Sequence, residues 1–211
     1  MIGKSHFDSG GNAVRIQGPG DTLMDESAFF PITTVGSGTL SAAAMNAGIV
    51  ERTGPVGAYA DVLDTADNLM ATLGNVSPGD SFEFWFRNTV AFANTVAVSE
   101  GAELSGSFTA VAASLVRRYL VTIFATARRQ SWLLTTTNAS AVVTGLTQSQ
   151  AQVLQPGMGI TGTNIPAATT VLSVNSVTGT VTLSAAATGS ASNAMTFFPR
   201  YNIRGISSAT L

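Results

Sequence analysis

Residues 81–88 read Ser-Phe-Glu-Phe-Trp-Phe-Arg-Asn, and this stretch is the strongest indication of the fold class of the chain. Aromatic side chains recur at every second position, which places Phe82, Phe84 and Phe86 on one face of an extended strand. The polar residues between them lie on the opposite face, together with Trp85. A strict period of two in β-forming residues predicts a strand that packs one face against a hydrophobic core.

The surrounding sequence continues this pattern. From 31 to 127 it is mostly β-like, with further strands predicted at 95–98 and 117–124. One amphipathic helix is predicted at 64–73, and Gly74 is suited to end it. We therefore expect an all-β domain, a β-sandwich or a barrel-like fold, with one short helix.

A second feature is the distribution of charge. Residues 130–199, about a third of the chain, contain no Asp, Glu, Lys or Arg, and only 10% of the whole chain is charged. Gln, Asn, Gly and Pro interrupt the segment too often for a membrane span. Its short strand-like runs predict a smaller all-β module. Its Thr, Ser, Asn and Gln surface is suited to close packing against other copies.

The first thirty residues differ from both regions. They are rich in glycine and turn-forming residues and carry only isolated apolar side chains, too few to build a core. We expect an extended N-terminal arm that is ordered by something outside itself. Apolar and aromatic side chains dominate such contacts. The candidate anchors of the arm on a partner are Phe7, Ile16, Phe29 and Phe30.

These patterns divide the chain into four parts. We expect the arm at 1–30, a β-rich domain at 31–130, the uncharged module at 131–198 and a C-terminal segment at 199–211. The module begins directly after a strand of the β-rich domain. It is either an insertion in a terminal strand of that domain or a tandem domain, and both alternatives stay open.

The sequence contains few residues suited to catalysis or metal binding. There is no cysteine, and His6 is the only histidine. Asp61, Asp64 and Asp67 are spaced by three around the predicted helix start, where carboxylates complement the helix dipole and the free N–H groups. A net charge of −2 gives no reason to expect nucleic acid as a partner. We expect no enzymatic activity, no cofactor and no metal.

Three residues are candidates for a subunit interface, namely Trp85, Arg117 and Arg118. Adjacent arginines of a strand point to opposite faces, so this pair does not make one basic patch, and pairing with carboxylates is favoured. Trp85 lies on the strand face opposite the phenylalanines. Two positions stay open for it, under the predicted helix or at a subunit contact.

Two stretches resemble elements of tailed-phage virion proteins. The first resembles a β-rich domain of capsid decoration (cement) proteins and related head proteins, at residues 49–55, 64–66, 69–73, 79–84, 87–89, 94–96, 101 and 104–106. The second resembles a small β-module of phage and other viral surface proteins, including tail and fibre components, at residues 156–166, 169–171 and 183–184. These motifs consist of turns and strands and include no catalytic signature.

The resemblance implies a virion protein on the outside of a phage capsid that cements neighbouring major capsid subunits. It implies that residues 31–130 bind the capsid and form a homo-oligomer, a trimer. From the low charge and the interrupted apolar runs we expect no binding to nucleic acid or to a membrane. One alternative is a tail or fibre protein whose uncharged module binds a receptor or glycan. Another is a glycan-degrading virion hydrolase, although the module offers no carboxylate pair.

Overall fold

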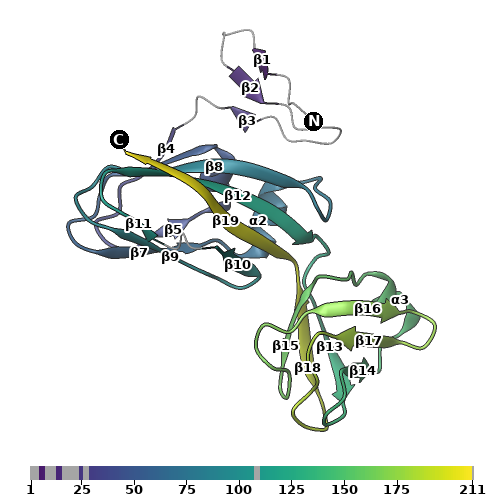
Figure 1. Ribbon diagram of the computed structural model, residues 1–211. Coiled ribbons are helices and arrows are strands. Elements are labelled where there is room, and N and C mark those ends of the chain that lie inside the picture. Colours follow the sequence, from purple (N-terminus) through teal and green to yellow (C-terminus); the bar gives the residue numbers. More distant parts are fainter. Residues whose placement is uncertain (1–4, 8–12, 16–23, 26–28, 107–109, 211) are drawn as a thin grey trace. The chain divides into compact units, whose positions relative to one another are not determined.

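The computed structural model describes residues 5–7, 13–15, 24–25, 29–106 and 110–210. The chain forms two compact units (Figure 1). Unit 1 comprises Met1–Ile123 and Tyr201–Leu211, and unit 2 comprises Phe124–Arg200. The chain of unit 1 therefore continues after unit 2, which is the arrangement of an insertion. The last eleven or so residues belong to β19 (Arg200–Thr210), a strand of the large sheet of unit 1.

Short paired strands occur in the segment expected to be an extended arm. These are β1 (Ser5–Phe7), β2 (Ala13–Arg15) and β3 (Met24–Asp25). β1 pairs with β2 and β2 with β3, both antiparallel. The next strand, β4 (Phe29–Ile32), belongs to the large sheet of unit 1, where it pairs with β6 (Ile49–Arg52).

Unit 1 contains a six-stranded sheet in the order β10-β19-β12-β8-β6-β4 and a four-stranded sheet in the order β11-β9-β7-β5. The remaining bounds are β5 (Thr39–Leu40), β7 (Tyr59–Leu63), β8 (Ser81–Asn88), β9 (Asn94–Ala97), β10 (Ala102–Ser105), β11 (Ala110–Val111) and β12 (Leu115–Ala125). From β4 to β12 the chain alternates between the two sheets.

This alternation explains the strand directions. Parallel neighbours need a long crossover connection, and here the crossover is a strand of the opposite sheet. Thus β4, β6 and β8 run parallel in the large sheet, and β5, β7 and β9 run parallel in the small one. β12 on β8 and β11 on β9 are antiparallel.

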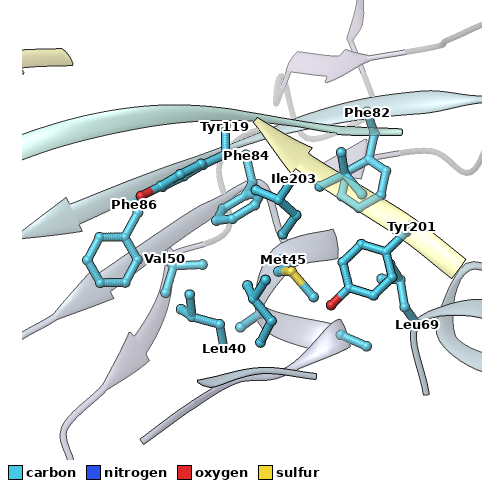
Figure 2. Close-up of a cluster of buried hydrophobic side chains, with 14 of the residues drawn as sticks. Leu40, Met45, Val50, Leu69, Phe82, Phe84, Phe86, Tyr119, Tyr201 and Ile203 are labelled. Carbon is cyan, nitrogen blue, oxygen red and sulfur yellow. The ribbon is translucent and has the colours of Figure 1, made fainter. Parts of the chain in front are cut away.

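The core of unit 1 lies between its two sheets. The predicted stripe of β8 is confirmed, because Phe82, Phe84 and Phe86 are all buried. Phe84 stacks on Tyr119 of β12, with 5.3 Å between the ring centroids. Figure 2 shows these rings in one cluster with Leu40 of the small sheet. The expected all-β fold is confirmed.

The described residues contain three short helices, where the sequence predicted one. The predicted helix is α2 (Ala66–Leu73), capped by Thr65 and ended by Gly74 at φ 73°. The other two are α1 (Ala42–Asn46) and α3 (Gln148–Gln152). Each of these two helices is five residues long, which is too short to show a helical period. The N-cap residue before each helix is the only local sequence signal for it. None of the described helices is long and apolar enough to cross a membrane.

Unit 2 is a six-stranded antiparallel sheet in the order β15-β18-β13-β14-β17-β16. Its strands are β13 (Gln130–Thr136), β14 (Val142–Thr144), β15 (Gly159–Gly162), β16 (Val171–Asn175), β17 (Thr180–Leu183) and β18 (Ala191–Phe198). A bridge between Gly159 and Thr170 joins the two edges, so the sheet closes into a small barrel around its own buried cluster.

Candidate functional site

A buried ion pair joins the two sheets of unit 1. Arg52 of β6 and Asp61 of β7 are joined by Nε to Oδ2 at 2.9 Å and Nη2 to Oδ1 at 3.1 Å, and both side chains are fully buried. Asp61 also accepts hydrogen bonds from the backbone N–H of Gly38 and from Asn94 Nδ2. The expectation that Asp61 serves the helix start is therefore wrong, because its carboxylate neutralises a buried arginine.

The Arg52 guanidinium also fixes the segment that follows β4. Its Nη1 donates to the carbonyl oxygens of Ile32 at 3.0 Å and Thr34 at 2.8 Å, and its Nη2 donates to that of Gly36. Its Cζ lies 4.9 Å from the ring centroid of Tyr59. A buried charge of this kind needs a counter-ion and further hydrogen bonds, and Arg52 has both. The ion pair therefore orders the backbone of residues 32–36. Neither side chain has a solvent-exposed atom with which to bind a substrate.

Tyr59 extends this cluster across the core. Its hydroxyl donates to Asn88 Oδ1 at 2.9 Å, and Asn88 Nδ2 donates to the carbonyl oxygens of Phe92, Val111 and Ala112. Burial raises the pKa of Tyr59 above its ordinary value, so the phenol keeps its proton. The polar side chains thus join strands of both sheets, and their role is to hold the sandwich together.

The other two aspartates serve the helix starts, as predicted. The Asp64 carboxylate accepts from the backbone N–H of Ala42 at 2.9 Å and of Thr65 at 2.8 Å, which ties α1 to α2. Asp67 lies in the first turn of α2. Tyr201 donates its hydroxyl to the Asp64 carbonyl oxygen, and burial raises its pKa above the ordinary range.

Trp85 lies on the outer face of the six-stranded sheet and is 39% exposed, so it is not under a helix. The Arg118 Cζ lies 5.8 Å from the Trp85 ring centroid. Arg118 donates to both carboxylate oxygens of Glu83, at 2.7 and 2.6 Å. Beside them, Arg87 and Glu51 form a second ion pair at 3.2 Å. We call Glu51, Glu83, Arg87 and Arg118 the paired-charge face. Its charges neutralise one another.

Arg117 lies apart from that face. It points to the opposite side of β12, as the alternation predicts, and is only 7% exposed. It pairs in register with Phe86 of β8. Its next neighbour on the same side is Tyr119, whose pKa burial raises to about 12. Arg117 therefore contributes little to the surface that Trp85 and Arg118 share.

The four arm candidates have different positions. Phe7 lies in β1 and Phe29 opens β4, and the structure describes the backbone of both. Ile16 lies outside the described residues. Phe30 is half-buried and packs against the core cluster of unit 1. Phe30 thus stabilises unit 1 itself, because β4 is a strand of its large sheet and packs against its core.

A surface that the sequence did not reveal covers the outside of the four-stranded sheet. Its strands pair so that outward residues form two adjacent rows, Ala110–Thr95–Ala60 and Ala97–Val62–Thr39. None of the six is charged, and all are exposed or half-exposed. We call this set the uncharged face. Its residues come from four strands across some seventy positions, so only the alternating topology brings them together.

Unit 2 has a surface of similar character. Apart from Arg128, Arg129 and Arg200 near its ends it has no charged residue, and Leu133 on the outside of β13 is 71% exposed. Arg129 lies over the ring of Phe198, with 5.7 Å between its Cζ and the ring centroid. The surface between its ends therefore offers polar and apolar contacts without electrostatic ones.

Among the residues that the structure describes, no group of three or more His, Cys, Asp or Glu side chains is placed to hold a metal ion. No protein-family model, no curated protein and no solved structure matches this chain. The relationship to phage virion proteins therefore stays a prediction from the sequence motifs.

Proposed function

We propose that this chain is a structural protein of a tailed-phage particle, which binds the outside of the capsid and cements neighbouring major capsid subunits. The observation that carries the proposal is that charged side chains of unit 1 pair with one another, both in its interior and on its surface. Arg52 and Asp61 are buried against each other, and the exposed charges of the paired-charge face neutralise one another. Unit 1 therefore offers a partner a stable scaffold and a contact surface, and a cement protein needs both.

In this role the mechanism is mechanical. Unit 1 forms a homo-oligomer, for which the resemblance implies a trimer. This oligomer brings several N-terminal segments to the capsid at once. Each segment makes modest contacts, with Phe7 and Ile16 as the proposed anchors, and linkage within one oligomer adds these contacts by avidity. The bound protein would then hold neighbouring capsid subunits together against outward force on the lattice, without any chemical reaction.

The test is a deletion of residues 1–28, which leaves the first strand of the large sheet intact because β4 begins at Phe29. Purified heads without decoration are mixed with the full chain or the deletion variant, and bound protein is measured after pelleting. We expect the full chain to pellet with heads and raise their melting temperature, and the deletion variant to do neither. Equal unfolding curves of the two proteins serve as the control for folding.

Two outcomes contradict the proposal. If the deletion variant decorates heads as well as the full chain, the segment is not the anchor. If electron microscopy of labelled particles shows the protein only at the tail, the alternative of a tail or fibre protein with a receptor- or glycan-binding module replaces it.

A further inference from the structure

Four connections between strands meet at one end of the large sheet of unit 1. Strands β4, β6 and β8 run parallel and end side by side, because Ile32 pairs with Arg52 and Arg52 pairs with Asn88. The antiparallel strand β12 begins opposite Asn88. The connections that follow the three parallel strands and the one that precedes β12 therefore lie together. We call them the rim, which consists of residues 33–38, 53–58, 89–93 and 112–114.

The buried ion pair of unit 1 bonds directly to the first of these connections. The Arg52 guanidinium donates to two backbone carbonyl oxygens within it, those of residues 34 and 36. Asp61 Oδ1 accepts from the backbone N–H of Gly38 at 2.8 Å. The pair therefore holds the connection near its start and at its end, although residues 33–37 are exposed.

The second and third connections are tied to the same centre. A Cβ at Gly54 would lie 2.0 Å from the Thr33 carbonyl oxygen, so the second connection packs closely on the first. The Arg52 carbonyl oxygen accepts from the Thr89 backbone N–H at 3.2 Å and from Thr89 Oγ1 at 2.7 Å. Arg52 thus uses its side chain for one connection and its backbone for another.

Asn88 adds the fourth connection to this network. Its Nδ2 donates to the carbonyl oxygens of Phe92 at 2.8 Å and Ala112 at 3.1 Å. Three apolar side chains of the rim are nevertheless exposed, namely Val35 at 63%, Val56 at 73% and Phe92 at 38%. The network therefore fixes the backbone of a surface and adds little to the core.

A buried ion pair is a costly way to stabilise a core. The free energy of removing two charges from water largely cancels their attraction, and apolar residues of similar volume often leave stability unchanged or raise it. Among the described residues, the buried charged side chains are Arg52, Asp61 and Arg117, all of unit 1. Unit 2 has its own buried apolar cluster without any of them.

We propose that the Arg52–Asp61 pair is a conformational clamp. It sets the shape of the rim and makes the four connections open as one unit, whereas the hydrophobic core supplies the stability of unit 1. Backbone carbonyls of a surface connection can bond to water, and the guanidinium replaces that water with donors at fixed positions. The clamp acts within one chain, so it is independent of capsid binding.

The experiment replaces both partners of the pair at once. Arg52→Met combined with Asp61→Leu removes the two charges and keeps side chains of similar volume. Amide hydrogen exchange is measured at two rim sites, the Val56 N–H, which donates to the Val35 carbonyl oxygen, and the Thr89 N–H. Neither hydrogen bond contains a side-chain atom of residue 52 or 61, so faster exchange reports the opening of the rim.

We expect exchange at both rim sites to be at least about tenfold faster in the double variant. The denaturant midpoint of unit 1, followed by Trp85 in a background without the second tryptophan, should equal or exceed that of the wild type. The Ile123 N–H, which donates to the Asp80 carbonyl oxygen near the far end of β12, should exchange as before. The matched control, Arg118→Met with Glu83→Leu, removes a half-exposed pair and should leave all three sites unchanged.

The wild-type chain provides a test that needs no variant. Its Val56 and Thr89 N–H groups should exchange through one shared opening, with the same free energy and the same dependence on denaturant. That free energy should be lower than the free energy of global unfolding, which the Ile123 N–H reports.

A fall in the midpoint of the double variant overturns the proposal, because the pair would then be needed for stability. Unchanged exchange at Val56 and Thr89 also overturns it, because the rim would then be held by other contacts. If the double variant does not fold, the wild-type measurement decides, and separate opening free energies at the two rim sites overturn the proposal.

Discussion

The two units of this chain build β-structure from opposite chemistry. Unit 1 has a fully buried ion pair, Arg52 with Asp61, and the three tyrosines of the chain. Unit 2 has three arginines near its ends and no other group that ionises between the acid and alkaline limits. One fold class can therefore be built around a hydrophobic core with a buried ion pair or without one, and the two units should respond to different perturbations.

In unit 2, short neutral side chains satisfy the backbone where unit 1 uses charge. Thr136 Oγ1 donates to the Gly189 carbonyl oxygen at 2.9 Å. Gln155 Oε1 accepts from the backbone N–H groups of Thr126 at 3.2 Å and Ala127 at 3.1 Å. Neutral hydrogen bonds of this kind contribute about 1 kcal/mol each and do not depend on pH.

The chain supplies its own reporters for this comparison. It has two tryptophans, Trp85 in unit 1 and Trp132 in unit 2, where Trp132 packs on Phe197. A Trp132→Phe background therefore reports the unfolding of unit 1 by fluorescence, and a Trp85→Phe background reports that of unit 2.

The largest effect is expected from Asp61→Ala. It leaves the Arg52 guanidinium buried without its counter-ion, which costs about 3–5 kcal/mol. Denaturant unfolding followed by Trp85 should show this loss, and the transition followed by Trp132 should change much less. The matched control is Glu83→Gln, which breaks the half-exposed pair with Arg118 and should cost only about 0.2–1 kcal/mol. Equal losses from the two variants would contradict a structural role for the buried pair.

Alkaline pH should separate the two units next. Unfolded tyrosine ionises near pH 10, whereas burial raises the pKa of Tyr119 to about 12 and that of Tyr201 further. As pH rises above about 10 the unfolded state therefore holds fewer protons than the folded state, and unit 1 loses stability. The loss is about 1.4 kcal/mol per pH unit for each such tyrosine.

Unit 2 has no tyrosine, so its unfolding midpoint should stay constant over the same range. The measurement is the denaturant midpoint of both tryptophan backgrounds from neutral pH to about pH 12. A parallel fall in the two midpoints would mean that the units unfold together.

Close side-chain packing should matter most for the stability of unit 2. Gly159→Ala tests this packing, with a smaller expected effect than the two predictions above. A Cβ at position 159 would lie 2.1 Å from Cε2 of Phe198, so the ring or the strand must move. We expect a loss of about 1–3 kcal/mol in the transition that Trp132 reports. Gly57→Ala in unit 1 is the control, because its Cβ would meet nothing within 4 Å. An unchanged Gly159→Ala variant would show that the barrel edge at β15 is loosely packed.

Prediction from sequence succeeded where a pattern is local and long enough. The eight-residue alternation of β8 fixed which side chains are buried, and the caps and period of α2 fixed that helix. It did not find α1 and α3, whose five residues are shorter than two helical turns. It placed Asp61 with the helix, because its partner Arg52 lies on a strand of the other sheet.

Periodicity and composition act along the chain, so the fold class, the uncharged segment and the inward face of β8 could be predicted from the sequence alone. The tertiary structure was needed to show that residues 124–200 form a unit inserted in the sequence of unit 1, and that the barrel closes at Gly159. It also decided that Thr39, Val62 and Ala97 share one row. Strand pairing joins residues that are distant in sequence, and no local pattern encodes which strand lies beside which.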